Sequence, residues 1–336
     1  MARPDDQEFD YNLEKMQVRT LFEEWRSDEE RAQAAMELLS RFKAETSESS
    51  ASLCEQLRIV LEPQLSQQLQ GDFKTGKRLN MKKVISFIAS HYRNDKIWLR
   101  RTLPSKRDYK ILIAIDDSLS MKEQNLGFFS LEAMVTLVEA LNRLEVGKVA
   151  VARIRDRMEL LQSFEDNYSN ERTAFIVSQY EFQHSAQNSH DFAMANFMRD
   201  ANKLLDLQNA SSQLQGTMSC PFTIILSDGR FNKANALKYI QEAQEKRYLY
   251  IFVILDAAAK TPKDQKAGRN TTGSSILNLR SAVKSEDGTG MKIMPYLKDF
   301  PFAYYCIVSD LRELPSALAS ILVQWFSLMS ASGGGP

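Results

Sequence analysis

The residues with the clearest chemistry lie in the stretch YKILIAIDDSLSM, which spans residues 109–121. A short apolar run ends there on a D-x-S-x-S pattern formed by Asp116, Ser118 and Ser120. On an extended loop, side chains at alternate positions point to the same side, so these three can converge while Asp117 points away. One carboxylate and two hydroxyls are hard oxygen ligands. They suit Mg²⁺, with Mn²⁺ as the alternative, better than zinc or copper.

A second carboxylate stands at the end of another predicted strand. The sequence PFTIILSDG places Asp228 directly after an apolar run. In open α/β sheets, ligands bind outside the carboxyl ends of the strands, and there Asp116 and Asp228 would share one rim. Taken alone, the D-x-S-x-S pattern also fits a turn capped by Asp and Ser. The two strand ends together favour a cation site.

Alternating strands and helices must position these residues. From residue 109 onward, short apolar runs alternate with amphipathic stretches of helical period. The predicted strands cover 109–115, 146–154, 221–227, 247–256 and 302–308, and the predicted helices cover 128–145, 191–207, 232–246 and 313–329. This alternation predicts a doubly wound, mostly parallel α/β sheet flanked by helices.

A helical part is predicted before this sheet, because apolar residues there recur at three- and four-residue steps. SESSAS, residues 47–52, is expected to break the first helical stretch, and a second helix with Pro63 inside it is expected to follow. The predicted divisions are a helical segment (1–50), a helical and basic extension packed on the sheet domain (51–108), the sheet domain (109–330) with an insertion near 257–300, and a tail (331–336).

Composition places the chain among ordinary globular proteins. Of its 336 residues, 43% are hydrophobic and 26% are charged, with a formal net charge of zero. A neutral chain has no overall field that attracts nucleic acid or a membrane, and no apolar run reaches the ~18 residues of a membrane span. Cys54, Cys220 and Cys306 are widely spaced and odd in number, so we expect reduced thiols in an intracellular protein.

Residues 71–78, GDFKTGKR, nearly match a phosphate-binding loop, but Arg78 replaces the hydroxyl that would contact magnesium and no apolar strand precedes them. We interpret this stretch as a basic turn between helices. It belongs to a stripe with twelve Lys and Arg between residues 74 and 110. Such a stripe fits RNA phosphate, an acidic protein face or simply a solvated surface.

The main enzymatic alternative is a phosphatase of the haloacid dehalogenase type, which also opens on aspartates at a strand end. There a D-x-D pattern supplies nucleophile and acid, whereas Ser118 stands where the second aspartate belongs. Metal-assisted hydrolysis would also need a positioned base, and no residue of the sequence fits that role convincingly.

The strand, D-x-S-x-S loop and helix, followed later by a strand ending in Ser-Asp-Gly, resemble the von Willebrand factor A fold with a metal-ion-dependent adhesion site. More narrowly, residues 57–121, 291–308 and 314–326 resemble the C-terminal region of the midasin family. These are giant dynein-related AAA ATPases of large ribosomal subunit assembly. The resemblance extends over roughly residues 53–329 and so rests on several segments.

The resemblance implies a nuclear, non-catalytic protein-binding module, with the ATPase motor outside this chain. The family holds Mg²⁺ at this site, and the matching residues of this chain are Asp116, Ser118, Ser120 and Asp228. A glutamate from the ubiquitin-like domain of a pre-60S assembly factor completes the metal shell, and the ATPase then pulls that factor from the particle. Insertions beside the metal loops help to hold the partner, which is the role we expect for residues 257–300.

The second-loop ligand departs from the family pattern, which usually has a threonine just before a helix. The corresponding stretch, QHSAQNSHDF, has none. Ser189 is the expected substitute and Ser185 the alternative, whereas His184 and His190 are poor partners for magnesium. Two further interpretations stay open: an adhesion or chelatase-type interaction subunit with the same metal fold, and an RNA-contacting module that uses the basic stripe.

Overall fold

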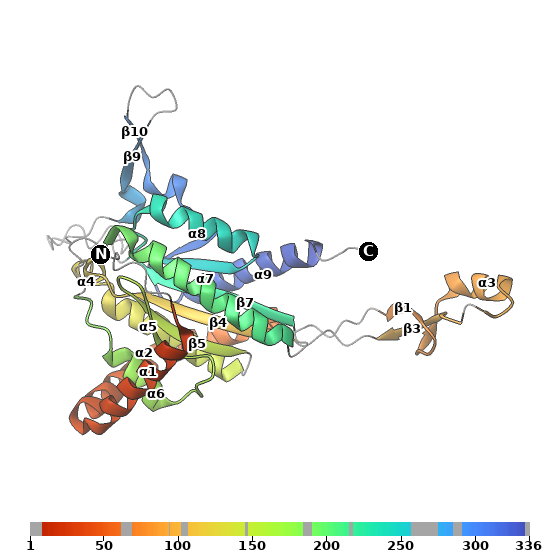
Figure 1. Ribbon diagram of the computed structural model, residues 1–336, viewed down its shortest axis with the longest axis horizontal. Coiled ribbons are helices and arrows are strands. Elements are labelled where there is room, and N and C mark those ends of the chain that lie inside the picture. Colours follow the sequence, from red (N-terminus) through yellow and green to blue (C-terminus); the bar gives the residue numbers. More distant parts are fainter. Residues whose placement is uncertain are drawn as a thin grey trace.

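The computed structural model describes residues 9–61, 69–93, 95–101, 107–144, 147–183, 190–214, 218–256, 275–284 and 291–332 (Figure 1). Its helices are α1 (Tyr11–Ser27), α2 (Glu29–Leu61), α3 (Met81–Ala89), α4 (Leu119–Glu123), α5 (Gly127–Leu144), α6 (Asn170–Ser178), α7 (His190–Leu214), α8 (Lys233–Glu245) and α9 (Leu314–Ser332), with 3₁₀ turns η4 (Ile276–Asn278) and η5 (Tyr296–Asp299). Its strands are β1 (Leu69–Phe73), β2 (Arg78–Leu79), β3 (Trp98–Arg101), β4 (Arg107–Asp116), β5 (Lys148–Ile154), β6 (Met158–Gln162), β7 (Met218–Ser227), β8 (Leu249–Leu255), β9 (Arg280–Lys284), β10 (Met291–Pro295) and β11 (Tyr304–Val308).

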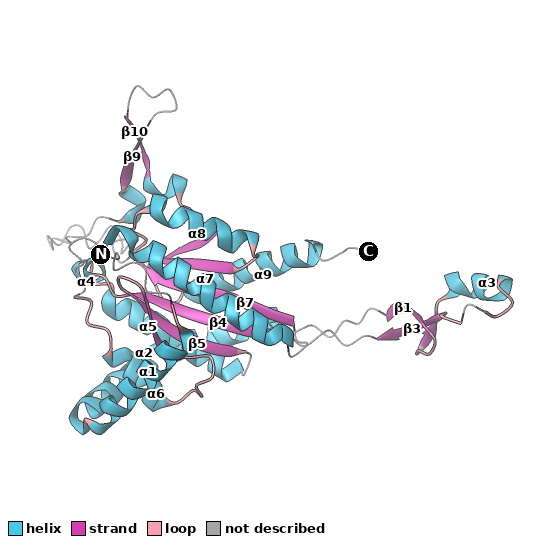
Figure 2. Cartoon of the chain, viewed as in Figure 1, coloured by secondary structure: helices cyan, strands magenta, loops and turns pink. Residues whose placement is uncertain are grey.

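A six-stranded sheet in the order β11-β8-β7-β4-β5-β6 forms the centre of the molecule (Figure 2). Each neighbouring pair is parallel except β5 and β6, so β6 is an antiparallel edge strand. Of these six strands, β4 comes first in the chain and lies beside β7, which comes fourth. The winding of the sheet reverses between them. This arrangement confirms the predicted doubly wound, mostly parallel α/β sheet flanked by helices.

Both faces of the sheet are covered, and β4 shows how the sequence achieves this. Ile111, Ile113 and Ile115 face a core built with α2, α5, α6 and α9. Leu112 and Ala114 face the opposite core, built with α7 and α8. Because successive strand residues point to opposite faces, a fully apolar run is what a sheet buried on both sides requires.

The N-terminal helices belong to the same packed unit. α2 lies against α5, α6 and α9, and it runs without interruption through residues 47–52, where a break was predicted. The break is absent because packing on these helices outweighs the local preference of the serines. The hydroxyls are satisfied within the helix: Thr46 Oγ1 donates to Phe42 O at 2.8 Å and Ser50 Oγ to Ser47 O at 3.0 Å. Both side chains are buried, so small hydroxyl residues serve as packing positions here.

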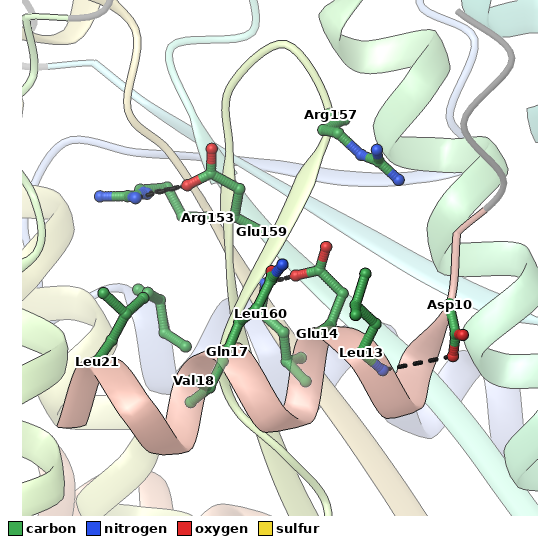
Figure 3. A pocket seen from close by; sticks show the side chains of 11 residues that line it. Asp10, Leu13, Glu14, Gln17, Val18, Leu21, Arg153, Arg157, Glu159 and Leu160 are labelled. Atoms are coloured by element: carbon green, nitrogen blue, oxygen red, sulfur yellow. Dashed lines mark hydrogen bonds and ion pairs between the residues drawn. The ribbon is translucent and has the colours of Figure 1, made fainter. Parts of the chain in front are cut away.

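α1 crosses the edge strand β6 (Figure 3). The Leu160 N–H faces the Glu14 carboxylate, with 3.5 Å between N and Oε2. Because an uncovered edge strand is a template for unwanted pairing, a helix laid across it protects the sheet. Neither β6 nor α6 was predicted, since both fall in a stretch whose short, mixed pattern looked irregular.

Residues 69–101 contain strands where helix and turn were predicted. α2 ends at Leu61. A small three-stranded sheet in the order β1-β3-β2 follows, and α3 lies between β2 and β3 in the sequence. Gly76, in the near-match to a phosphate loop, lies so close to β3 that an added Cβ would stand 2.3 Å from Leu99 O. Only a glycine fits at this position, because any larger residue would clash with β3. None of the nine residues of α3 is buried.

Two expectations about the whole chain concern membranes and thiols. Within the described ranges, no helix combines the length and hydropathy that a bilayer crossing requires. Cys54 and Cys220 are buried and Cys306 is half-buried, and all three are free thiols.

Candidate metal centre

The predicted site residues lie where the winding of the sheet reverses. β4 and β7 are parallel neighbours, with Ile115 opposite Leu226, so Asp116 and Ser227 end adjacent strands and Asp228 follows directly. The two strand ends are joined by a hydrogen bond of 2.7 Å, which Ser227 Oγ donates to Asp116 Oδ2. The shared rim expected for Asp116 and Asp228 is therefore present.

The D-x-S-x-S loop folds back on itself as its spacing predicts. Asp116 Oδ1 accepts a hydrogen bond from Ser118 N at 3.0 Å, and the hydroxyl oxygens of Ser118 and Ser120 lie 2.9 Å apart. Ser118 is the residue before α4, and the short helix turns the chain away from the sheet. Asp116, Ser118 and Ser120 are thereby brought together at one strand end.

Asp228 is almost completely buried, with 1% of its surface exposed. Gln124 Nε2 donates to its Oδ2 at 2.9 Å, and Arg230 N donates to its Oδ1 at 3.0 Å. Gln124 caps the end of α4, so it joins the loop after β4 to the loop after β7. The carboxylate is held in place by groups from both loops.

The electrostatics of this pair favour a cation. Burial, followed by the nearby charge of Asp228, raises the pKa of Asp116 from 3.8 to about 6, and hydrogen bonds from Ser227 and Ser118 oppose that rise. Two buried carboxylates that repel one another are stabilised together by a bound positive ion. The donors present, two carboxylates and two hydroxyls, are the hard oxygens that Mg²⁺ and Mn²⁺ take. Among the residues that the structure describes, no group of three or more His, Cys, Asp or Glu could hold a metal ion, at this rim or elsewhere, so the candidate site depends on its serine hydroxyls.

The second loop, residues 184–189, lies outside the described residues. It contains Ser189, Ser185 and His184, and His190 is described only as the first residue of α7. The second-loop ligand therefore stays a prediction from the sequence.

Asp117 has a structural importance that the sequence did not reveal. Its carboxylate is fully buried, and it accepts hydrogen bonds from Phe182 N at 2.8 Å and from Arg155 Nε at 2.7 Å. It is directed away from the hydroxyls, as expected, but towards a specific set of donors. The only sequence signal was a second aspartate beside the first, with no indication of its partners.

The insertion reaches the same rim through η5. The Tyr296 hydroxyl lies 3.0 Å from Gly229 O and 3.1 Å from Phe231 O, and it accepts a hydrogen bond from Phe231 N at 3.3 Å. Gly229 has a φ of 77°, and an added Cβ would stand 2.9 Å from Ile276 Cδ1 of η4. The described parts of the insertion thus fix the loop that carries Asp228.

Comparison with known proteins gives two clear sequence relatives. The chain is 38% identical over 298 residues to midasin of Dictyostelium discoideum, covering 88% of this chain and 5% of that protein. It is 33% identical over 291 residues to midasin of Giardia intestinalis, covering 85% of this chain and 6% of that protein. The chain thus spans about a twentieth of the length of these relatives. No family model matches it.

Similarity to solved structures is weaker. The conserved hypothetical protein BatB from Bacteroides thetaiotaomicron aligns with a TM-score of 0.40 at 13% identity, over 65% of this chain and 99% of that one. Proximal thread matrix protein 1 from the mussel byssus aligns with a TM-score of 0.38 at 12% identity, over 66% and 49%. Scores this low add nothing to the fold described above.

Proposed function

The chain is related to a short segment of midasin, and from that premise we propose that it is a metal-dependent protein-binding module of a ribosome-assembly ATPase. The observation that carries the proposal is the pair of buried carboxylates, Asp116 and Asp228, at the ends of adjacent strands beside the hydroxyls of Ser118 and Ser120. The module itself needs no catalytic residue, because its task is to hold a partner.

In this proposal, Asp116, Ser118, Ser120 and Asp228 hold Mg²⁺, or Mn²⁺ in its place, together with a second-loop hydroxyl from Ser189 or Ser185. A magnesium ion bound there supplies a coordination position that an acidic side chain of a partner can fill. Neighbouring residues keep the two carboxylates buried and fixed: Ser227 holds Asp116, and Gln124 holds Asp228. Binding strength is thereby concentrated at one buried point, as at other interface hot spots.

The proposed partner is the ubiquitin-like domain of a pre-60S assembly factor, recognised through an acidic residue. Force from the ATPase elsewhere in the longer protein would then be transmitted through this contact to remove the factor, in the nucleus. The kinship with midasin supports this role. The insertion near residues 257–300 is the proposed second contact with the partner, because η5 packs on the loop after Asp228.

Calorimetric titration of such a ubiquitin-like domain into the chain tests the proposal. Binding is expected in Mg²⁺ and lost in EDTA, and Asp116→Ala should abolish it. Asp206→Ala is the matched control, because Asp206 is a partly exposed carboxylate on α7 that pairs with Lys246 away from the metal loops. Binding that is indifferent to EDTA and to Asp116→Ala would contradict the proposal.

A second binding surface is favoured by the small sheet and α3. Met81, Ile85 and Ile88 are 72%, 75% and 58% exposed on a helix that also carries Lys82 and Lys83. This helix is one part of the basic stripe, for which RNA contact remains the alternative function. RNA binding that weakens with salt but survives EDTA would favour that alternative.

A further inference from the structure

The buried carboxylate of Asp117 sits between the first metal loop and the chain that leads into the second. Residues 184–189, with both candidate serines, follow Phe182 almost immediately. Asp117 Oδ1 accepts from Phe182 N at 2.8 Å, while the Asp117 N–H donates to Ile154 O at 3.1 Å. One residue thus fixes the D-x-S-x-S loop, the end of β5 and the approach to the second loop.

The approach to the second loop has a backbone that needs such support. Phe182 has a φ of 52°, a left-handed conformation that is unfavourable for a large side chain and persists only where the surroundings hold it. Its ring is buried and stacks on Tyr180 with 5.8 Å between centroids. It also packs on Gly127 at the start of α5, where an added Cβ would stand 2.8 Å from Phe182 Cδ2.

Arginines from β5 and the turn after it complete the arrangement. Arg155 Nε donates to Asp117 Oδ2 at 2.7 Å, and Arg153 Nη1 lies 3.9 Å from the same oxygen. Arg153 also donates to the carbonyl of Gln179, and its Nε donates to Glu159 at 3.0 Å (Figure 3). The segment from 179 to 182 is therefore held at both ends by the Asp117–Arg153 pair.

The same turn also contacts α7, the helix that follows residues 184–189 in the chain. Asn196 Nδ2, on α7, donates to Asp156 O at 2.9 Å, and Arg157 Nε lies 3.7 Å from the fully buried Asp200. The chain before the second loop and the helix after it are both attached to residues 153–157. Asp117 is the point at which this assembly joins the first metal loop.

We propose that Asp117 is a positioning residue of the cation site, which fixes the D-x-S-x-S loop against β5 and the segment 179–182 without contacting the ion itself. This inference rests on the proposed metal-binding function. Both Asp117 oxygens already accept hydrogen bonds from Phe182 and Arg155, so the residue acts through the protein. Partners that orient metal ligands typically change metal affinity by about 10- to 100-fold when removed.

Titration with Mn²⁺ alone, followed by the electron paramagnetic resonance signal of the free ion, tests this role. Asp117→Asn keeps the size of the side chain and an oxygen for Phe182 N, but removes the charge that faces Arg155. We expect its Mn²⁺ affinity to fall by about tenfold or more. Arg155→Gln, at a residue whose side chain is 25% exposed, should lower the affinity in the same direction by a smaller factor, and it serves if Asp117→Asn does not fold.

Asp166→Asn is the matched control. Asp166 also accepts a backbone N–H, from Ser163 at 2.9 Å, and faces Arg172 at 3.5 Å, but it lies away from the metal loops. Its loss should lower the melting temperature and leave Mn²⁺ affinity within about twofold. If Asp117→Asn and Arg155→Gln likewise change only the melting temperature, the positioning role is wrong. If Asp116→Ala itself leaves Mn²⁺ binding intact, the proposed function is wrong.

Discussion

Ser227 Oγ donates a hydrogen bond of 2.7 Å to Asp116 Oδ2 and so joins the ends of the two strands between which the sheet reverses its winding. The contact links residues 111 positions apart in the sequence. Burial and the charge of Asp228 raise the pKa of Asp116. The hydrogen bond from Ser227 opposes that rise, because it favours the charged form of the carboxylate.

Without a divalent cation, Asp116 should make the protein less stable as the pH rises. Its pKa is raised from 3.8 to about 6 in the folded state, so the folded protein binds the proton more tightly than the unfolded chain. The contribution is fully present below pH about 4 and is lost as the pH rises through about 6, up to about 3 kcal/mol. Thermal unfolding in EDTA should show the Asp116→Asn variant gaining stability relative to the unaltered protein over this range. Parallel stability curves would contradict it.

Ser227→Ala should make cation binding more sensitive to acid. Loss of its hydrogen bond removes an interaction that lowers the pKa of Asp116, so protons compete with the cation at higher pH. Mn²⁺ titrations between pH 5 and about 8 should show the affinity of the variant falling off at a higher pH than that of the unaltered protein. Thr223→Val, at a buried hydroxyl earlier in the same strand, is the control and should leave the pH profile unchanged.

Tyr296→Phe should loosen the loop after Asp228. The variant loses the hydroxyl that accepts from Phe231 N, which should cost about 1 kcal/mol of unfolding free energy. Hydrogen exchange at the Phe231 amide should become faster, because its acceptor is gone. Tyr305→Phe, at a partly exposed ring on β11, is the matched control. Unchanged exchange at Phe231 would show that the insertion does not hold this loop.

Leu53→Ala should destabilise the whole domain, because α2 is part of its core. Leu53 is fully buried, and truncation of such a side chain typically costs about 2–5 kcal/mol. Ile59→Ala, in the same helix but 69% exposed, should change the unfolding free energy by no more than about 0.5 kcal/mol. Chemical denaturation of both variants compares them directly. Similar small losses would mean that α2 packs only loosely on α5, α6 and α9.

The sheet was predictable because its strands carry a strong local signal. The fully apolar run from Tyr109 to Ile115 has the composition of a strand buried on both faces, and the runs before Asp228 and Asp256 repeat it. The convergence of Asp116, Ser118 and Ser120 followed from their spacing alone. β6 and the small sheet at residues 69–101 were missed, because short strands with mixed polarity resemble loops when read locally.

The surroundings of the site were not predictable, since they depend on contacts between distant parts of the chain. Asp117 meets Phe182 and Arg155 only after the sheet has formed, and no local pattern marks those partners. The same holds for the serines of residues 47–52, whose sequence suggests a break. Packing on α5, α6 and α9, which buries Thr46 and Ser50, keeps α2 continuous.

Anomalous X-ray scattering from crystals of the protein soaked in Mn²⁺ tests the central claim most directly. The account predicts one strong peak at the rim between β4 and β7, surrounded by Asp116, Ser118, Ser120, Asp228 and a serine from residues 184–189. The peak should be absent in the Asp116→Ala variant. An unaltered protein that shows no peak there, or that binds Mn²⁺ only at another place, would contradict the account.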